Sequence, residues 1–451
     1  MVTVDRATLR ALLEREVATF HERTPRSREL YQRARGSLVG GVPMPWMMRW
    51  AGGYPTFAAH AQGARVVDVD GHEYVDLALG DTGAMAGHSP PATVEAVTRQ
   101  AKGGITTMLP TEDALWVAEE LSRRFGMARW MFTLTATDAN RGALRLARQI
   151  TERPKVLVYS YCYHGSVDEA FAVRGPGETT ISRDGNVGPA VDPAATTVAV
   201  EFNDLPALEA ALAGGEIAVV LAEPAMTNMG IVLPEVGYHD ALRALTRETG
   251  TLLIIDETHT FSAGPGGCTQ AWGLQPDMVT IGKSIGGGVP SGALGLADDV
   301  ATQMFEQAEA DYEDTGGVGG TLAGNPLSSA AMRATLEQVL TAEAFELMTA
   351  LATRFAEGVQ SVIDQQGVAW NVTQLGCRAE YQFLPEAARD GTIAYASHDG
   401  ELERYLHLHA LNRGVMITPF HNMALMSPAT THDDVDAHTI VFGEAVGELV
   451  R

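Results

Sequence analysis

Two acidic residues and one lysine have types and positions suited to chemistry on a carbonyl compound. Asp256 and Glu257 end the apolar run 251–256, and Lys283 follows the run 277–282 and precedes a string of glycines. Carboxylates at the carboxyl ends of parallel strands face the crevice where α/β folds bind ligands. A lysine at such a place can form an imine. Taken singly, these patterns are also typical of an acidic loop and a surface lysine, but the chain holds only three lysines: Lys102, Lys155 and Lys283.

Two further segments could support that chemistry. Thr135, Ala136 and Thr137 precede a predicted helix with Asp138 in its first turn, so backbone N–H groups there could bind an anion such as phosphate. Tyr163-His164-Gly165 follows the apolar run 155–160 and would present an aromatic ring at the same sheet edge. A simple helix cap and a core tyrosine are the plainer interpretations of these two segments.

The pattern of apolar runs predicts the elements that position these residues. Short Val/Ile/Leu runs alternate with helical patterns, which indicates an α/β fold with a mostly parallel, doubly wound sheet covered on both faces. Asn325 and Pro326 open a further helix as N-cap and first helical residue. A β-hairpin is expected at 64–79 and a glycine-rich loop at 316–320. The expected strands are 155–160, 217–223, 251–256 and 277–282, and the expected helices are 112–125, 138–150, 204–213 and 238–249.

Composition narrows the class of protein. The 451 residues carry 32 basic and 56 acidic side chains, a formal net charge of −24. Such a chain repels a phosphate backbone, so general nucleic-acid binding is excluded. The three cysteines, Cys162, Cys268 and Cys377, have neither zinc-site nor disulfide spacing, and no metal is expected. Without a secretory signal or 18 consecutive apolar residues, a soluble cytoplasmic protein without membrane contact is expected.

Four motifs in one order resemble those of a known family. They are AEP at 222–224, IIDE at 254–257, GKSIGGG at 282–288 and GTLAGNPLSSAA at 320–331. Together they resemble the class III aminotransferases, near the glutamate-1-semialdehyde aminomutase and ω-transaminase branches of fold type I enzymes dependent on pyridoxal 5'-phosphate. The resemblance runs from about residue 35 to 445. It implies an N-terminal segment (1–75) belonging to the small domain, a large cofactor-binding domain (76–330) with a mostly parallel sheet flanked by helices, and a C-terminal α+β small domain (331–451).

The resemblance also implies roles for single residues. Lys283 matches the Schiff-base lysine and Asp256 the partner of the pyridine nitrogen. Tyr163, followed by His164, matches the aromatic residue that stacks on the cofactor. Thr135, Ala136 and Thr137 match the phosphate-binding segment, Asn228 an active-site asparagine, and Thr321 a threonine that the neighbouring subunit of a homodimer supplies. Ala136 stands where the family has glycine, so this loop must do without glycine's freedom at positive φ.

Two activities of the family compete. A transaminase would move an amino group from an amine or a β- or ω-amino acid to a keto acid such as pyruvate; the alternative is an aminomutase of the glutamate-1-semialdehyde type. Met423 and Asp81 stand where the aminomutase branch has a glutamate and an aromatic residue, which favours the transaminase. A catalytically inactive protein of this fold would lack the lysine, which is present here.

Substrate contacts are expected outside the sheet edge. The segment 419–427 contains His421 but no arginine for a carboxylate, so Arg49 is the expected cation, with Trp46 and other Met and Trp side chains around it as an apolar pocket. A solvated loop arginine is the alternative for Arg49, and an interface core is the alternative for the apolar residues. The expected substrate-binding residues are Arg49, Trp46, Asp81 and His421.

Overall fold

The computed structural model describes residues 4–308 and 318–450 and divides into two compact units. The large unit comprises the described residues of 91–345 together with 388–396. The small unit comprises 4–90, 346–387 and 397–450. The two main boundaries, near 90 and 345, lie 15 residues beyond those expected at 75 and 330. Part of the expected loop at 316–320 lies outside the described residues.

Local contacts account for the positions of these boundaries. Asp76 Oδ2 lies 2.7 Å from Nε2 of His88, and Gly63 forms a β-bridge with His88, so the stretch after residue 75 stays with the small unit. Helix α10, Pro326–Gln338, packs on α3 and α4 of the large unit, which carries that unit past residue 330.

The large unit is built on a seven-stranded sheet of order β4-β12-β11-β10-β9-β5-β8, in which only β12 runs antiparallel to its neighbours. The mostly parallel sheet is therefore confirmed. All six residues of β9 are buried, as a strand covered on both faces requires. The strands are β4 Arg129–Thr133, β5 Lys155–Tyr159, β8 Thr197–Val200, β9 Ile217–Ala222, β10 Leu252–Asp256, β11 Met278–Ile281 and β12 Gly292–Leu296, with a separate hairpin of β6 Ala172–Arg174 and β7 Thr180–Ser182.

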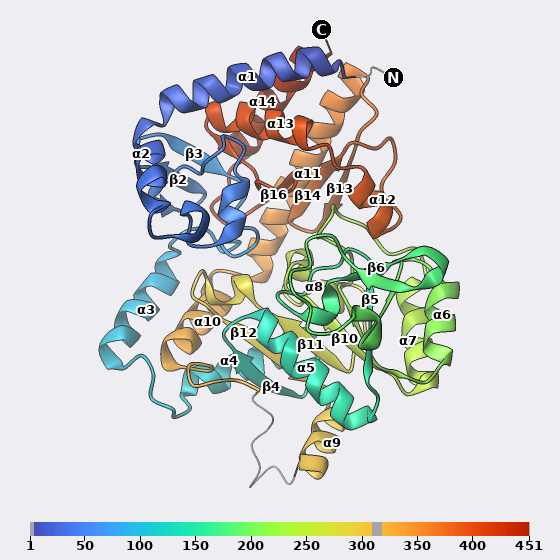
Figure 1. Cartoon of the computed structure of the whole chain (residues 1–451). Helices are drawn as coiled ribbons and strands as arrows, with labels where there is room; N and C mark the ends of the chain where they lie inside the picture. The colour runs from blue at the N-terminus through green and yellow to red at the C-terminus, as the bar shows by residue number, and fades with distance from the viewer. Residues whose placement is uncertain (1–3, 309–317, 451) are drawn as a thin grey trace. The chain divides into compact units, whose positions relative to one another are not determined.

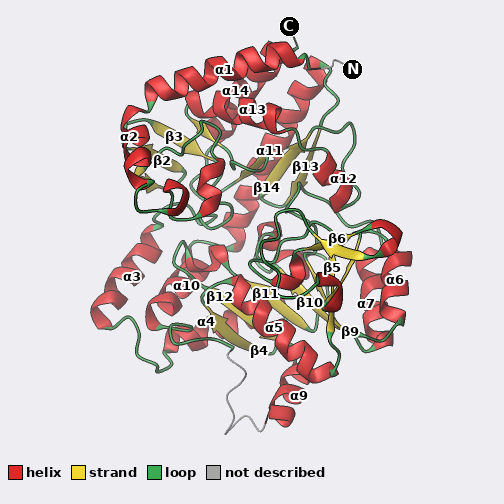
Figure 2. Cartoon of the chain, in the orientation of Figure 1, coloured by secondary structure: helices red, strands yellow, loops and turns green. Residues whose placement is uncertain are grey.

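Helices flank this sheet (Figures 1 and 2). Helix α5 packs across β4 and β9 to β12, while α4, α6 and α7 pack on β4, β8 and β10 respectively. The four helices expected from the sequence are all present, with starts within two residues of those expected. The helices are α3 Pro91–Gly103, α4 Glu112–Phe125, α5 Ala136–Thr151, α6 Leu205–Ala213, α7 Tyr238–Thr249, α8 Gly267–Ala271, α9 Asp298–Ala308, α10, the start of α11 Ala342–Gln366, and α12 Gly391–Ala396. Asn325 caps α10 by accepting from the Ser328 N–H at 2.9 Å, as expected.

The small unit contains two small sheets and long helices. Its sheets have the orders β1-β2-β3-β15 and β13-β14-β16, and β2 and β3 form the expected hairpin around Asp70-Gly71. Its elements are α1 Arg6–Arg23, α2 Pro25–Ala34, β1 Ala58–Gln62, β2 Arg65–Asp68, β3 Glu73–Asp76, most of α11, β13 Asn371–Leu375, β14 Arg378–Gln382, α13 Gly400–Asn412, β15 Val415–Met416, β16 Met423–Leu425 and α14 His432–Leu449.

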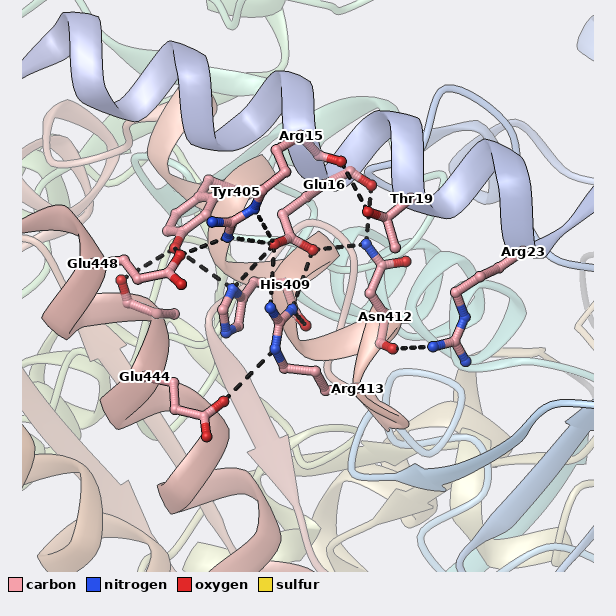
Figure 3. A network of polar contacts seen from close by, with 11 residues as sticks. Arg15, Glu16, Thr19, Arg23, Tyr405, His409, Asn412, Arg413, Glu444 and Glu448 are labelled. Carbon is pink, nitrogen blue, oxygen red and sulfur yellow. Dashed lines mark hydrogen bonds and ion pairs between the residues drawn. The ribbon is translucent and has the colours of Figure 1, made fainter.

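A buried carboxylate fixes α1 to the helices at the other end of the chain (Figure 3). Glu16 is 2% exposed, and its Oε2 accepts from Asn412 Nδ2 at 2.8 Å and from Arg413 Nη1 at 3.1 Å. Burial alone would raise the pKa of Glu16, but hydrogen bonds from His409, Arg413, Asn412 and Arg15 hold it well below its ordinary value. Glu16 is therefore charged at neutral pH and stabilises the small unit.

Two general properties bear on the environment of the chain. In the part of the chain that the structure describes, no helix has the length and apolar character needed to cross a membrane. The three cysteines are unpaired and buried.

Candidate active site

The expected site residues of the large unit lie in loops that follow five strands of the sheet. These strands, β4, β5, β9, β10 and β11, all run in the same direction. Their carboxyl ends therefore meet at one edge of the sheet, where α/β folds bind ligands. The sheet accordingly gathers the segments 134–138, 160–166, 223–228, 256–259 and 282–286.

Asp256 is the last residue of β10, and its carboxylate is held by donors from three directions. Its Oδ2 accepts from Asn140 Nδ2 at 2.8 Å and lies 2.9 Å from Nδ1 of His164, while Oδ1 accepts from the Thr258 N–H at 3.0 Å. The Asn140 amide is itself oriented, because its Oδ1 accepts from the Thr280 hydroxyl at 2.7 Å. The carboxylate is therefore fixed in position although it is only 3% exposed.

These contacts set the charge of the pair. Burial would raise the pKa of Asp256, but the hydrogen bond and charge of His164, with the hydrogen bonds of Thr258 and Asn140, lower it to about 2. Burial would lower the pKa of His164, yet Cys162 and Asp256 raise it well above the ordinary histidine value. Asp256 is therefore an anion at neutral pH and can hold a cationic group beside it.

The amino-terminal end of α5 offers backbone donors to an anion. Thr135 is its N-cap and accepts from the Asp138 N–H at 3.2 Å, while Ala136 and Thr137 lie in the first turn, where backbone N–H groups have no acceptor within the helix. The loop does without glycine at position 136, as expected: Ala136 begins a regular helix, has no positive φ and carries no such strain. The glycine that the region requires is Gly282, where a Cβ would lie 2.9 Å from the Ala136 nitrogen.

The loop after β5 approaches this helix end closely. Thr137 Oγ1 accepts from the Ser166 N–H at 3.2 Å. A Cβ on Gly165, whose φ is +78°, would lie 1.9 Å from the same oxygen. Glycine at this position thus allows Tyr163 and His164 to come beside the first turn of α5.

Two expected cofactor residues lie in loops that are joined to each other. Tyr163 is half-buried in the irregular segment after β5. Asn228 is buried, and its Nδ2 donates to the backbone oxygen of Tyr161 at 2.8 Å, which ties the loop after β9 to the loop after β5. Tyr161 has a φ of +65° and stacks on Tyr395, with ring centroids 4.3 Å apart.

Lys283 begins the short 3-10 turn Lys283–Gly286 after β11, with a φ of +51°. Its Nζ lies 2.5 Å from Nε2 of His259, and Nδ1 of the same ring lies 2.7 Å from the Thr227 hydroxyl. Thr227 in turn donates to Glu223, the first residue after β9. No role for these three residues was expected from the sequence, although Glu223 stands in the AEP motif and His259 follows Asp256 by three positions.

The expected substrate residues of the small unit are only partly clustered. The Arg49 guanidinium lies 5.7 Å from the centre of the Trp46 ring and 6.0 Å from that of Phe420. The Trp46 and Phe420 rings meet edge to face at 4.8 Å, and Phe420 lies 5.1 Å from the ring of His421. The structure thus brings Arg49, Trp46 and His421 around one phenylalanine.

Other expected residues have different surroundings. His421 is 5% exposed, and its Nδ1 lies 3.3 Å from Oε1 of the buried Glu380. Asp81 is half-buried in the turn after β3, with a φ of +50°. Thr321, in the large unit, is exposed in a turn before α10.

The family model for class-III aminotransferases matches residues 47–442. Glutamate-1-semialdehyde 2,1-aminomutase of Roseiflexus castenholzii is 35% identical over 402 residues, covering 88% of this chain and 91% of that protein. A solved glutamate-1-semialdehyde aminomutase from Pseudomonas aeruginosa PAO1 is 47% identical, with a TM-score of 0.96 and 99% of both chains covered, and a variant of it was solved with PMP. A solved omega-transaminase from Sphaerobacter thermophilus is 29% identical, with a TM-score of 0.84, covering 94% of this chain and 97% of that chain.

The family model covers most of the chain, and the mostly parallel sheet flanked by helices agrees with the fold of this family. The expected α/β architecture of fold type I is confirmed, as is the cofactor, pyridoxal 5'-phosphate. The chain belongs to the class-III aminotransferases and is a pyridoxal-phosphate-dependent enzyme of the transferase or isomerase kind.

Proposed function

We propose that the chain holds pyridoxal 5'-phosphate at the carboxyl edge of the large sheet and moves an amino group by covalent chemistry at Lys283. Three observations support this site: an amine at one strand end, a buried anion at the next, and a helix amino-terminus beside them. A lysine can hold an aldehyde covalently, and a helix amino-terminus favours phosphate.

The residues present fit the cofactor. Asp256 would hold the proton on the pyridine nitrogen, because a carboxylate whose pKa is about 2 stays charged beside a cation. Thr135, Ala136 and Thr137 would bind the phosphate through hydroxyl and backbone N–H groups. Tyr163 would lie against the ring, while His164 would orient Asp256 from behind and Asn228 would fix the loop that carries Tyr161.

The chain's own residues then handle protons and position. When bound, the cofactor supplies an electron sink for the carbon that bears the amino group. Lys283 Nζ would take the proton from that carbon and hold it until it is returned. Asp256 would keep its charge throughout, since three donors hold it in one orientation.

The aminomutase activity is better supported than the transaminase activity expected from the sequence. The observation that carries it is the similarity to the Pseudomonas aeruginosa aminomutase, at 47% identity over 99% of both chains against 29% for the omega-transaminase. The proposed reaction therefore moves an amino group between adjacent carbons of a glutamate-1-semialdehyde-like substrate. No second substrate would be consumed.

Transamination of an amine or a β- or ω-amino acid is the second candidate, favoured by Met423. This side chain is fully buried in β16, opposite Glu380 of β14, so a buried apolar side chain occupies the position where the aminomutase branch has a glutamate. Arg49, with Trp46 and Phe420 beside it, would then bind a substrate with one carboxylate and a bulky apolar group.

A direct comparison of the two reactions tests the proposal. The loaded enzyme is given glutamate-1-semialdehyde without a keto acid, and formation of the isomer with its amino group on carbon 1 is measured. In parallel it is given arylalkyl amines and β-amino acids with pyruvate, and alanine is measured. We expect isomerisation without an acceptor; alanine formation with no isomerisation would contradict the aminomutase. The Lys283→Ala variant serves as the blank in both assays.

A homodimer with shared active sites, in the cytoplasm, is part of this proposal. Thr321 lines a cavity of about 250 Å³ together with Met108 and Leu109. Those two apolar side chains are 75% and 69% exposed, as is typical of a surface that a protein partner covers. Thr321 would reach the phosphate bound by the other subunit.

A further inference from the structure

A continuous chain of polar contacts runs from Lys283 to a buried carboxylate. Lys283 Nζ contacts His259 Nε2 at 2.5 Å, His259 Nδ1 contacts the Thr227 hydroxyl at 2.7 Å, and that hydroxyl donates to Glu223 Oε2. Glu223, Thr227 and His259 are 4%, 1% and 8% exposed. They come from the ends of β9 and β10, next to the end of β11 that carries Lys283.

The single proton of Thr227 fixes the proton positions along this chain. A threonine hydroxyl has one hydrogen to donate, and here it goes to Glu223. The oxygen can therefore only accept from His259, which places the ring proton on Nδ1. A neutral ring with its proton on Nδ1 has a lone pair on Nε2, the atom that faces Lys283.

We propose that His259 is the base that takes the proton from the Lys283 ammonium when this lysine is not joined to an aldehyde, and that Thr227 and Glu223 are the residues that position His259 for this role. The inference rests on the proposed role of Lys283. It extends that role to Thr227 and His259, which lie outside the four family motifs, and to Glu223, which lies in the AEP motif at 222–224.

The proposed step is a single proton transfer. One N–H bond of the Lys283 ammonium breaks, a bond from that proton to His259 Nε2 forms, and the electron pair stays on Nζ. His259 becomes an imidazolium whose Nδ1–H points at Thr227, and the Glu223 carboxylate stabilises the new charge through the threonine. Nothing is oxidised or reduced. Lysine is a nucleophile only without its extra proton, so the step prepares Lys283 to attack an aldehyde.

The ionisable groups whose contacts with the relay are described come from three neighbouring segments. Lys283 faces Nε2 from the turn after β11, and Glu223 faces Nδ1 through Thr227 from the loop after β9. On its own segment, Asp256 is engaged by His164 and Asn140, and Glu257 accepts from Thr260 and Thr269. Glu223 is therefore the carboxylate of the relay formed by Lys283, His259, Thr227 and Glu223.

The rate of covalent capture tests the proposal without measuring turnover. The full chain, freed of cofactor, is mixed with pyridoxal 5'-phosphate at pH values from 6 to 10, reduced with borohydride at set times and digested. Mass spectrometry then gives the rate of adduct formation at Lys283. Lys102 and Lys155, the latter paired with Glu216 at 3.0 Å, are internal references.

We expect capture near pH 7 to be about tenfold or more slower in His259→Leu, because general-base assistance is lost. The deficit should shrink as the pH rises, since solvent then removes the proton. His259→Gln should remain slow, because an amide accepts a hydrogen bond but not the proton. Thr227→Val should be slow and Thr227→Ser close to wild type, since serine restores the hydroxyl.

Several results would overturn this inference. One is a wild-type capture rate in His259→Leu. Another is a wild-type capture rate in His259→Gln, which would show that the residue positions Lys283 but does not take its proton. A third is a deficit that does not change with pH, as a merely structural effect would give. Equal capture rates in the Thr227→Val and Thr227→Ser proteins would show that the Thr227 hydroxyl has no role. This comparison decides the question even if His259→Leu folds poorly. Absence of any Lys283 adduct in the wild type would instead contradict the proposed function.

Discussion

Nδ1 of His164 lies 2.9 Å from Oδ2 of Asp256, and both side chains are buried. The histidine comes from the loop after β5 and the aspartate from the end of β10, two strands away in the sheet. The pair joins a cation to an anion, which keeps the pKa of Asp256 at about 2 although burial opposes its charge. The carboxylate at the end of β10 therefore stays ionised, with His164 as its charged partner.

Asp256→Asn should retain the fold and lose most of the activity. An amide cannot hold a proton on a pyridine nitrogen, so we expect kcat to fall roughly a thousandfold, about 4 kcal/mol of transition-state free energy. The measurement is kcat for isomerisation and for transamination, with Asp240→Asn, an exposed aspartate of α7, as control. Rates within tenfold of wild type would show that Asp256 does not have this role.

Gly165→Ala should weaken cofactor retention. The new Cβ would lie 1.9 Å from the Thr137 oxygen, so the loop after β5 must move away from α5. Gly177→Ala is the matched control, because Gly177 also has positive φ but has nothing within 4 Å of its added Cβ. We expect the dissociation constant for pyridoxal 5'-phosphate to rise at least about tenfold, or 1.4 kcal/mol, only in Gly165→Ala. Equal effects of the two changes would show that strain at positive φ, and not the clash, is responsible.

The elements around the site could be predicted wherever apolar runs and caps agree. The runs ending at Asp256 and before Lys283 are continuous apolar segments, typical of buried parallel strands, and both strands are present. Asn325 followed by Pro326 marks the start of α10 because both residues favour the same backbone geometry.

Strand β12 shows why part of the sheet could not be predicted. Its sequence, GALGL, lacks the β-branched residues typical of strands. The glycines are required by neighbours: a Cβ on Gly292 would lie 2.5 Å from the Thr133 hydroxyl, and one on Gly295 would lie 2.7 Å from the Trp130 ring. Contacts with neighbouring strands therefore require glycine at these two positions, and the local sequence pattern does not indicate such contacts.

The relay could not be predicted for a related reason. Glu223, Thr227 and His259 lie on two loops, and only the folded sheet brings them to Lys283. His259 follows the IIDE motif at 254–257 by two positions, and no spacing in the sequence indicates that it faces Lys283.

Mixing two inactive proteins tests the proposed shared site. Thr321→Ala should weaken phosphate binding in the partner's site, and Lys283→Ala should abolish activity. In a mixed dimer, one of the two sites would combine Lys283 of one chain with Thr321 of the other. After random exchange of equal amounts, half of the dimers are mixed, so the activity of the mixture should return to about a quarter of wild type. Sedimentation should show at least a dimer. An active monomer, or mixing without recovery, would contradict the shared site.

Glu16→Gln should destabilise the small unit by about 2 kcal/mol at pH 7, since it removes the buried charge that accepts from Asn412 and Arg413. The native pKa of Glu16 is depressed, so its stabilisation is complete above the unfolded pKa of about 4.3 and is lost as the pH falls below it. Urea unfolding midpoints should therefore differ most above pH 5 and converge towards pH 3.5. Glu14→Gln, an exposed change on the same helix, should have little effect. A difference in urea midpoint that does not change with pH would show that the charge of Glu16 is not the cause.

The assignment of Lys283 as the covalent centre is tested most directly by borohydride reduction of the loaded enzyme, followed by peptide mass spectrometry. With only three lysines in the chain, the outcome is unambiguous. The account predicts a reduced cofactor adduct on Lys283 alone, and a Lys283→Ala protein that binds the cofactor without a covalent bond and has no turnover. An adduct on Lys102 or Lys155, or near wild-type turnover in Lys283→Ala, would contradict it.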